Sequence, residues 1–127
     1  LPKIVGISRA LELTYSGRII DAQEALQLNL VSSIHDSENL LSNAVDITKK
    51  MVQNSAPVSI SLTRQMLWRS LEGSGPYDAH IVESKAIDSR GASEDAKEGV
   101  SSFLEKRAAE FKNKVSEDMP SFFPWWK

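Results

Sequence analysis

Cysteine is absent from this 127-residue chain, which excludes a disulfide framework, a thiol nucleophile and a thiolate metal site. Its two histidines, His35 and His80, lie far apart and lack metal-ligand spacing, so we predict no metal site. Neither sign of charge dominates, because 15 basic residues stand against 17 acidic ones, and we therefore expect no nucleic-acid partner. No apolar run approaches the roughly 20 residues of a membrane-spanning helix.

Short motifs that mark common catalytic sites are also missing. The sequence contains no GxGxxG, no P-loop and no GxSxG. Carboxylates do cluster at Glu94, Asp95 and Glu98, shortly after Glu83 and Asp88. Paired carboxylates can transfer protons, but acidic residues are rarely buried, so we interpret this cluster as solvated helix surface. We predict no catalytic residue in this chain.

Apolar residues recur at helical spacing along most of the chain. The pattern predicts helices within 1–17 (broken near Gly6), 21–28, 36–52, 57–71, 77–90 and 93–111, with a loop at 73–76. The run 30–34 is the only strand candidate, and a lone strand cannot pair its own backbone. The predicted class is therefore mainly α, with at most one short strand.

The stretch 93–111 carries the most specific pattern. Ser93 suits the N-cap, because its hydroxyl can accept an amide hydrogen bond from the first turn. Phe103 and Lys106 are three residues apart and so share a helix face, where a ring beside an ammonium could hold a flat anionic ligand. Core packing of Phe103 beside a solvated lysine is the competing interpretation. The predicted apolar stripe consists of Ala96, Val100, Phe103, Leu104, Ala108 and Phe111.

The two ends of the chain differ in character. Leu1 opens without an initiator Met or a signal-peptide pattern, which, together with the lone strand, predicts a piece of a larger protein. The segment 122–126 contains four aromatic residues, each of which gains roughly 1.5–3 kcal/mol on burial. We expect this segment to dock on this chain or on a neighbour. Membrane contact is the weaker alternative.

Three blocks resemble the enoyl-CoA hydratase/isomerase (crotonase) superfamily. They are LPKIVGISRALELTYSGRIIDAQEALQLNLVSSI at 1–34, SAPVSISLTRQML at 55–67 and SEDAKEGVSSFLEKRAAEF at 93–111. Asn29 stands where that family usually has Gly, but asparagine tolerates a left-handed backbone, so the turn should survive. The resemblance implies the C-terminal helical (trimerisation) portion of a crotonase-like α/β spiral fold. Its expected parts are the end of the core at 1–35, a helical oligomerisation region at 36–112 and an aromatic tail at 113–127.

The same resemblance implies an enzyme that handles acyl-CoA. We expect the parent protein to be an enoyl-CoA hydratase-like lyase of fatty acid metabolism, with a coenzyme A thioester as substrate and no permanently bound cofactor. The family's oxyanion hole and two glutamates are expected upstream of Leu1, so the isolated chain is expected to be inactive. Phe103 and Lys106 match family positions that contact the adenine and 3′-phosphate of CoA, commonly from a neighbouring subunit.

Assembly and location follow from the resemblance as well. We expect a homo-oligomer, a trimer or hexamer in the parent protein, in the cytoplasm or alternatively in the mitochondrial matrix. Two other functions stay open. One is another crotonase reaction, either double-bond isomerisation or acyl-CoA thioester hydrolysis. The other is a non-catalytic helical assembly module.

Overall fold

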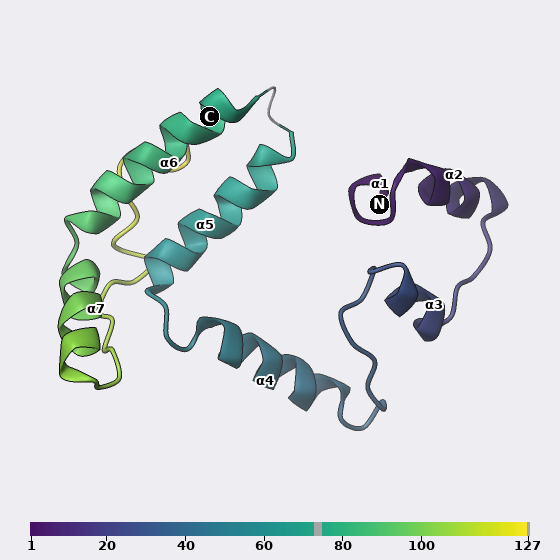
Figure 1. The fold of residues 1–127 in the computed structure, drawn as a ribbon, viewed down its shortest axis with the longest axis horizontal. Helices are drawn as coiled ribbons and strands as arrows, with labels where there is room; N and C mark the ends of the chain where they lie inside the picture. The colour runs from purple at the N-terminus through teal and green to yellow at the C-terminus, as the bar shows by residue number, and fades with distance from the viewer. Residues whose placement is uncertain (73–74, 127) are drawn as a thin grey trace. The chain divides into compact units, whose positions relative to one another are not determined.

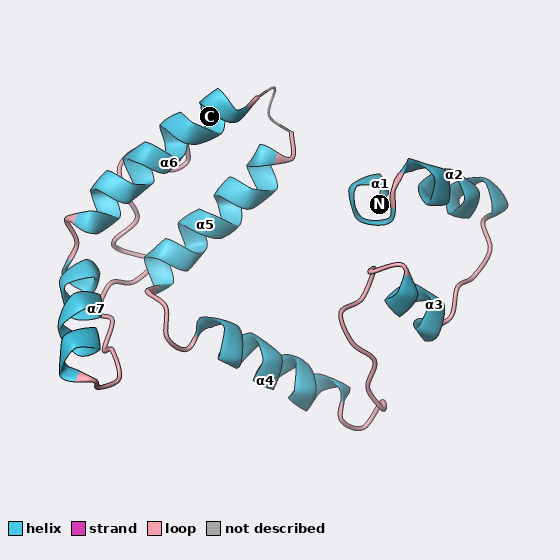
Figure 2. Cartoon of the chain, in the orientation of Figure 1, coloured by secondary structure: helices cyan, strands magenta, loops and turns pink. Residues whose placement is uncertain are grey.

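A computed structural model describes residues 1–72 and 75–126 (Figure 1). Residues 73–74 of the predicted loop, and Lys127 at the end of the predicted tail, lie outside the described residues. The chain divides into two compact units, Leu1–Ile47 and Thr48–Lys127. The described residues form helices and loops, with no strand among them (Figure 2).

The first unit contains three short helices whose ends follow the local sequence signals. Gly17 takes the left-handed conformation with φ 58° and closes the second helix, as predicted. The Asp21 carboxylate caps the third helix by accepting the Glu24 amide at 2.7 Å, also as predicted. Asn29 has φ 57°, so the predicted left-handed turn is confirmed. The helices are α1 (Pro2–Val5), α2 (Ile7–Ser16) and α3 (Ala22–Gln27).

Arg18 links α2 to α3. Its guanidinium donates to Glu12 at 2.9 Å and to Glu24 at 2.7 Å, and these hydrogen bonds lower the pKa of both carboxyls. All three side chains are in contact with solvent, so the contribution of this cluster to stability is modest.

The strand candidate at 30–34 is not a strand in this structure. The amides of Leu30 and Val31 donate instead to the Ala25 carbonyl, at 2.9 and 3.4 Å, and so complete the end of α3. Because these donors are satisfied locally and no strand lies among the described residues to pair with, the segment stays irregular.

The second unit is built on two neighbouring long helices, α5 (Pro57–Ser70) and α6 (Pro76–Gly91) (Figure 1). Pro57 occupies the first turn of α5, as predicted. The helix before them, α4 (Leu40–Val52), crosses the boundary between the units. It begins later than residue 36, because the Asn39 amide turns back to the Asp36 carbonyl at 2.9 Å. The last helix is α7 (Glu94–Glu105).

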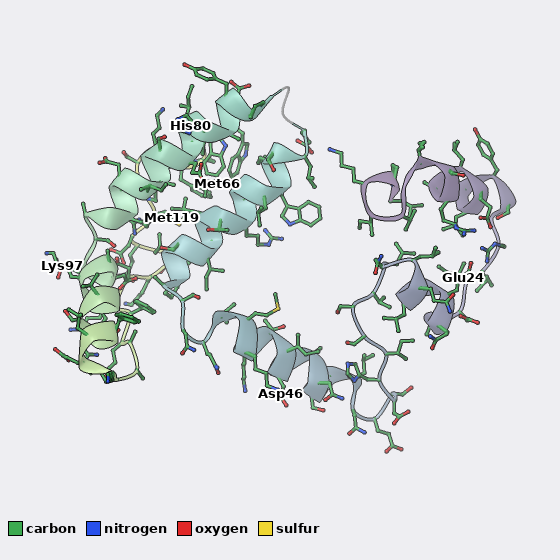
Figure 3. All side chains as sticks on the ribbon, viewed as in Figure 1. Glu24, Asp46, Met66, His80, Lys97 and Met119 are labelled. Atoms are coloured by element: carbon green, nitrogen blue, oxygen red, sulfur yellow. The ribbon has the colours of Figure 1, made fainter. Side chains whose placement is uncertain are left out.

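The aromatic tail docks on this chain, one of the two placements expected for it. The buried core of Val58, Leu62 and Ala86 is covered by half-buried side chains from α5 and from the tail, and Figure 3 shows Met66 and Met119 between α5 and α6. The covering residues are Met66, Met119, Phe122, Phe123 and Trp125.

Aromatic contacts hold the docked tail together. The rings of Phe123 and Trp126 meet edge-on with centroids 5.2 Å apart, and those of Trp125 and Trp126 lie 5.0 Å apart. The Arg69 guanidinium of α5 lies 4.2 Å from the Trp126 ring centroid, in a cation–π contact. Across residues 1–72 and 75–126, no helix is both long and apolar enough to cross a membrane.

Candidate ligand-binding site

Helix α7 starts as predicted but ends early. The Ser93 hydroxyl accepts the Ala96 amide at 3.2 Å, which confirms the N-cap. The helix was predicted to continue to Phe111 but stops at Glu105, because Lys106 adopts a left-handed backbone with φ 55° and ψ 39°. The Arg107 amide then turns back to the Ser102 carbonyl at 3.1 Å.

The predicted apolar stripe of α7 is therefore only partly correct. Ala108 and Phe111 do not belong to the helix, since they follow the turn at Lys106. Val100 is 61% exposed and Leu104 is 72% exposed, so the helical spacing is real but this face contacts no core. The side of α7 that is buried in this unit carries Asp95 and Ser102 instead.

Phe103 and Lys106 lie at the same end of α7. Phe103 is 82% exposed, so within this chain the competing interpretation of a core phenylalanine is wrong. Lys106 is also exposed, one residue beyond the last helical residue. The structure thus presents an open aromatic face and an ammonium close together along the chain.

Arg107, the next residue, is engaged by carboxylates. Its two Nη atoms donate to the two oxygens of Glu98 at 2.5 and 2.9 Å, and its Nε donates to Glu105 at 2.6 Å. Hydrogen bonds from Arg107, and then from the Glu110 amide at 2.7 Å, lower the pKa of Glu98 to about 2. The same carboxylates raise the pKa of Arg107.

Lys106, by contrast, makes no salt bridge to any residue that the structure describes. Its charge is therefore not compensated locally, whereas that of its neighbour Arg107 is. An exposed ammonium of this kind can bind an anionic group from solution.

The acidic cluster differs from the prediction of a solvated surface. Glu94 does face solvent and pairs with Lys97 at 2.7 Å, while Figure 3 shows Lys97 on the outside of α7. Asp95, however, is only 4% exposed, and its Oδ1 accepts the amides of Lys112 and Asn113 at 2.8 and 3.1 Å. The solvated interpretation is wrong for Asp95, because the segment after α7 folds back over it.

The remaining titratable candidates are dispersed. His35 belongs to the first unit, where its Nε2 lies 2.8 Å from the Ser33 hydroxyl, and His80 belongs to α6 in the second. No cluster of three metal-ligating side chains occurs among the residues described. What α7 and its turn offer is a binding surface, made of the Phe103 ring and the Lys106 ammonium, which forms no salt bridge with the residues that the structure describes.

Comparison with known proteins assigns the chain to a family. The family model described as enoyl-CoA hydratase/isomerase matches residues 1–114. Enoyl-CoA hydratase ACTT3 of Alternaria alternata is 35% identical over 92% of this chain and 39% of its own length. The short-chain-enoyl-CoA hydratase of Clostridium acetobutylicum is 34% identical over 90% of this chain and 43% of its own. The crystal structure of an enoyl-CoA hydratase from Bacillus anthracis matches with a TM-score of 0.80 and 28% identity, over 89% of this chain and 43% of that one.

The chain spans only about 40% of the length of these relatives. The predicted fold class was wrong, because the match is assigned to the N-terminal part of crotonase proteins rather than to their C-terminal trimerisation portion. The broader resemblance is confirmed, because the family model covers most of the chain. The chain belongs to the enoyl-CoA hydratase/isomerase (crotonase) superfamily.

Proposed function

We propose that this chain is part of an enoyl-CoA hydratase-like enzyme, in which it binds the nucleotide end of an acyl-CoA substrate. The relatives named above are enoyl-CoA hydratases, which supports a substrate of the 2-enoyl-CoA class. The observation that carries the binding role is the open end of α7, where Phe103 is exposed and Lys106 is unpaired among the described residues.

Each side chain has a distinct part in this proposal. The ring of Phe103 offers an apolar face on which the adenine of CoA can stack. The ammonium of Lys106 is a compact charge suited to the 3′-phosphate. Since both groups are exposed, their contact with ligand stays partly hydrated, and an exposed ion pair contributes about 0.2–1 kcal/mol.

The backbone of Lys106 supports a role for its side chain. A non-glycine residue in the left-handed region costs roughly 1–2 kcal/mol relative to its ordinary conformation, and glycine is the usual occupant of this position after a helix. Lysine is therefore a poor structural choice at φ 55°, which is consistent with selection for its ammonium.

Binding and chemistry are separate in this proposal. Most carboxylates near α7 are committed to cations or backbone amides, namely Glu94, Asp95 and Glu98. We propose that the chain on its own does not hydrate crotonyl-CoA. An absorbance assay of crotonyl-CoA with the pure chain checks this, and turnover that persists after removal of contaminating full-length enzyme contradicts it.

The CoA contact is tested by calorimetry with two ligands, CoA and dephospho-CoA, which lacks the 3′-phosphate. The chain should bind CoA more tightly, and Lys106→Ala should abolish the difference while leaving dephospho-CoA binding unchanged. Lys97→Ala is the matched control, because it removes another exposed lysine of α7. Equal affinity of the unchanged chain for both ligands contradicts the proposal.

A non-catalytic helical assembly module is the second candidate, and exposed apolar side chains favour it. Leu41 is 77% exposed and Met51 is 74% exposed on α4, in addition to the open face of α7. Such surfaces mark contacts with other chains. Sedimentation with and without CoA separates the candidates: defined homo-oligomers that bind no CoA favour assembly alone.

A further inference from the structure

The turn that carries Lys106 is held from one side by the acidic face of α7. After α7 the chain reverses, and residues 110–113 return along the helix. Two carboxylates of α7, one helical turn apart, accept backbone amides of this returning segment. The carboxylates belong to Asp95 and Glu98.

Glu98 makes the larger set of contacts. Both of its oxygens bind the guanidinium of Arg107, and its Oε1 also accepts the Glu110 amide at 2.7 Å. Planar two-point pairing of this type fixes direction as well as distance. Glu98 therefore joins the residue that follows Lys106 to the body of the helix.

Asp95 secures the far end of the same turn. Its side chain is buried, and its Oδ1 accepts both the Lys112 and the Asn113 amides. A buried carboxylate that accepts two backbone donors is costly to release, because all three groups would lose their partners.

Lys106 is thus fixed on both sides of its backbone. Its own amide donates to the Phe103 carbonyl at 3.3 Å, and the next amide, of Arg107, donates to the Ser102 carbonyl at 3.1 Å. With Arg107 also tied through its side chain, the backbone of Lys106 is held in the left-handed conformation, which fixes the direction of its Cα–Cβ bond. A ligand then meets a cation whose backbone is already ordered, which lowers the entropic cost of binding.

From these contacts we infer that Glu98, acting through Arg107, is a positioning residue for Lys106 and helps to select ligands that carry a terminal phosphate, with Asp95 securing the same turn. This inference rests on the proposed contact between Lys106 and the CoA phosphate. It assigns to Glu98 no contact with ligand and no proton transfer.

The test measures the affinities of the 127-residue chain for CoA and for dephospho-CoA by calorimetry. The readout is the ratio of the two affinities, because a general loss of structure in the chain weakens the binding of both ligands together. The variants are Glu98→Ala, which removes every contact, and Glu98→Gln, which keeps the shape but loses the charge. Glu94→Gln is the matched control, since it removes one carboxylate charge from the same helix outside the turn.

We expect the unchanged chain to prefer CoA by up to about fivefold, the upper end of the range for one exposed ion pair. Glu98→Ala should lose most of this preference although Lys106 is intact, Glu98→Gln should lose part of it, and Glu94→Gln should keep it. If Glu98→Ala does not fold, as judged by circular dichroism, Glu98→Gln decides alone. If a folded Glu98 variant keeps the full preference for CoA over dephospho-CoA while Lys106→Ala loses it, the positioning role is overturned and the proposed function stands. No preference in the unchanged chain overturns both.

Discussion

Replacing Lys106 by glycine should make the protein more stable while it removes the candidate ligand contact. Glycine has no Cβ to oppose φ 55°, whereas lysine and alanine both do. The left-handed conformation costs a residue with a Cβ roughly 1–2 kcal/mol, a cost that glycine avoids. The greater conformational freedom of glycine in the unfolded chain offsets about 0.5–1 kcal/mol of this gain in stability.

The net expectation for Lys106→Gly is a gain of about 0.5–1 kcal/mol in the free energy of unfolding. For a chain of this size that corresponds to a rise of about 2–4 °C in Tm. Lys106→Ala should show no such gain, since alanine keeps the strain. Both variants should lose the preference for CoA over dephospho-CoA.

Urea denaturation followed by circular dichroism measures the first effect, and calorimetry measures the second. Lys97→Gly is the matched control, because it makes the same change inside α7 and should cost about 1 kcal/mol. A Lys106→Gly variant that is no more stable than Lys106→Ala refutes the argument from backbone strain. Retained CoA preference in Lys106→Gly refutes the role of the ammonium.

Three further predictions concern the contacts of the second unit. Asp95→Ala should cost about 1–3 kcal/mol, because two amides lose their acceptor; hydrogen exchange should then accelerate at residues 112–113, and unchanged exchange there contradicts the contact. Glu98 has a folded pKa of about 2, below its usual 4.5, so its stabilisation should be complete above about pH 4.5 and lost as the pH falls toward 2. Melting scans across that range check this, and Glu98→Gln should flatten the profile; an equally steep profile in the variant would assign the dependence to other groups. Trp125→Ala should cost about 3 kcal/mol, because its ring covers the core; urea unfolding measures the loss, and a value near zero would mean that the tail is not docked in solution.

Local signals in the sequence predicted the starts of α3, α5 and α7 well, although not that of α4. The carboxylate of Asp21 and the hydroxyl of Ser93 each accept a hydrogen bond from an amide three residues further along the chain. Both partners of each cap therefore lie within a short stretch of sequence, where a local pattern can identify them. Gly17 and Asn29 are residue types that tolerate a positive φ, and both adopt one.

The end of α7 could not be predicted in the same way. Lysine is an ordinary helix residue, and nothing about Lys106 marks a terminator. The turn is held by Glu98 with Arg107, nine residues apart, and by Asp95 with amides 17 and 18 residues away. Such contacts depend on where the returning chain lies, which local patterning does not specify.

Periodicity predicted which apolar residues share one face of α7, but it did not predict that this face is exposed. Val100 and Leu104 recur at helical spacing, yet both face solvent in this chain. Spacing determines which residues share a face, whereas burial requires a second surface to pack against. For the same reason the candidate site was only partly predictable: Phe103 and Lys106 were identified, but the carboxylates behind the turn were taken for surface.

The docked aromatic tail also affects the order in which the second unit can fold during synthesis. The core residues Val58, Leu62 and Ala86 are translated long before Met119, Phe122 and Trp125, which cover them. A nascent chain that has emerged only to residue 112 holds α5 and α6 with one side of their core unprotected. Contacts of such long sequence separation slow folding and expose apolar surface to association. Two of the three tryptophans lie in the tail, so intrinsic fluorescence should report the moment at which this surface is closed.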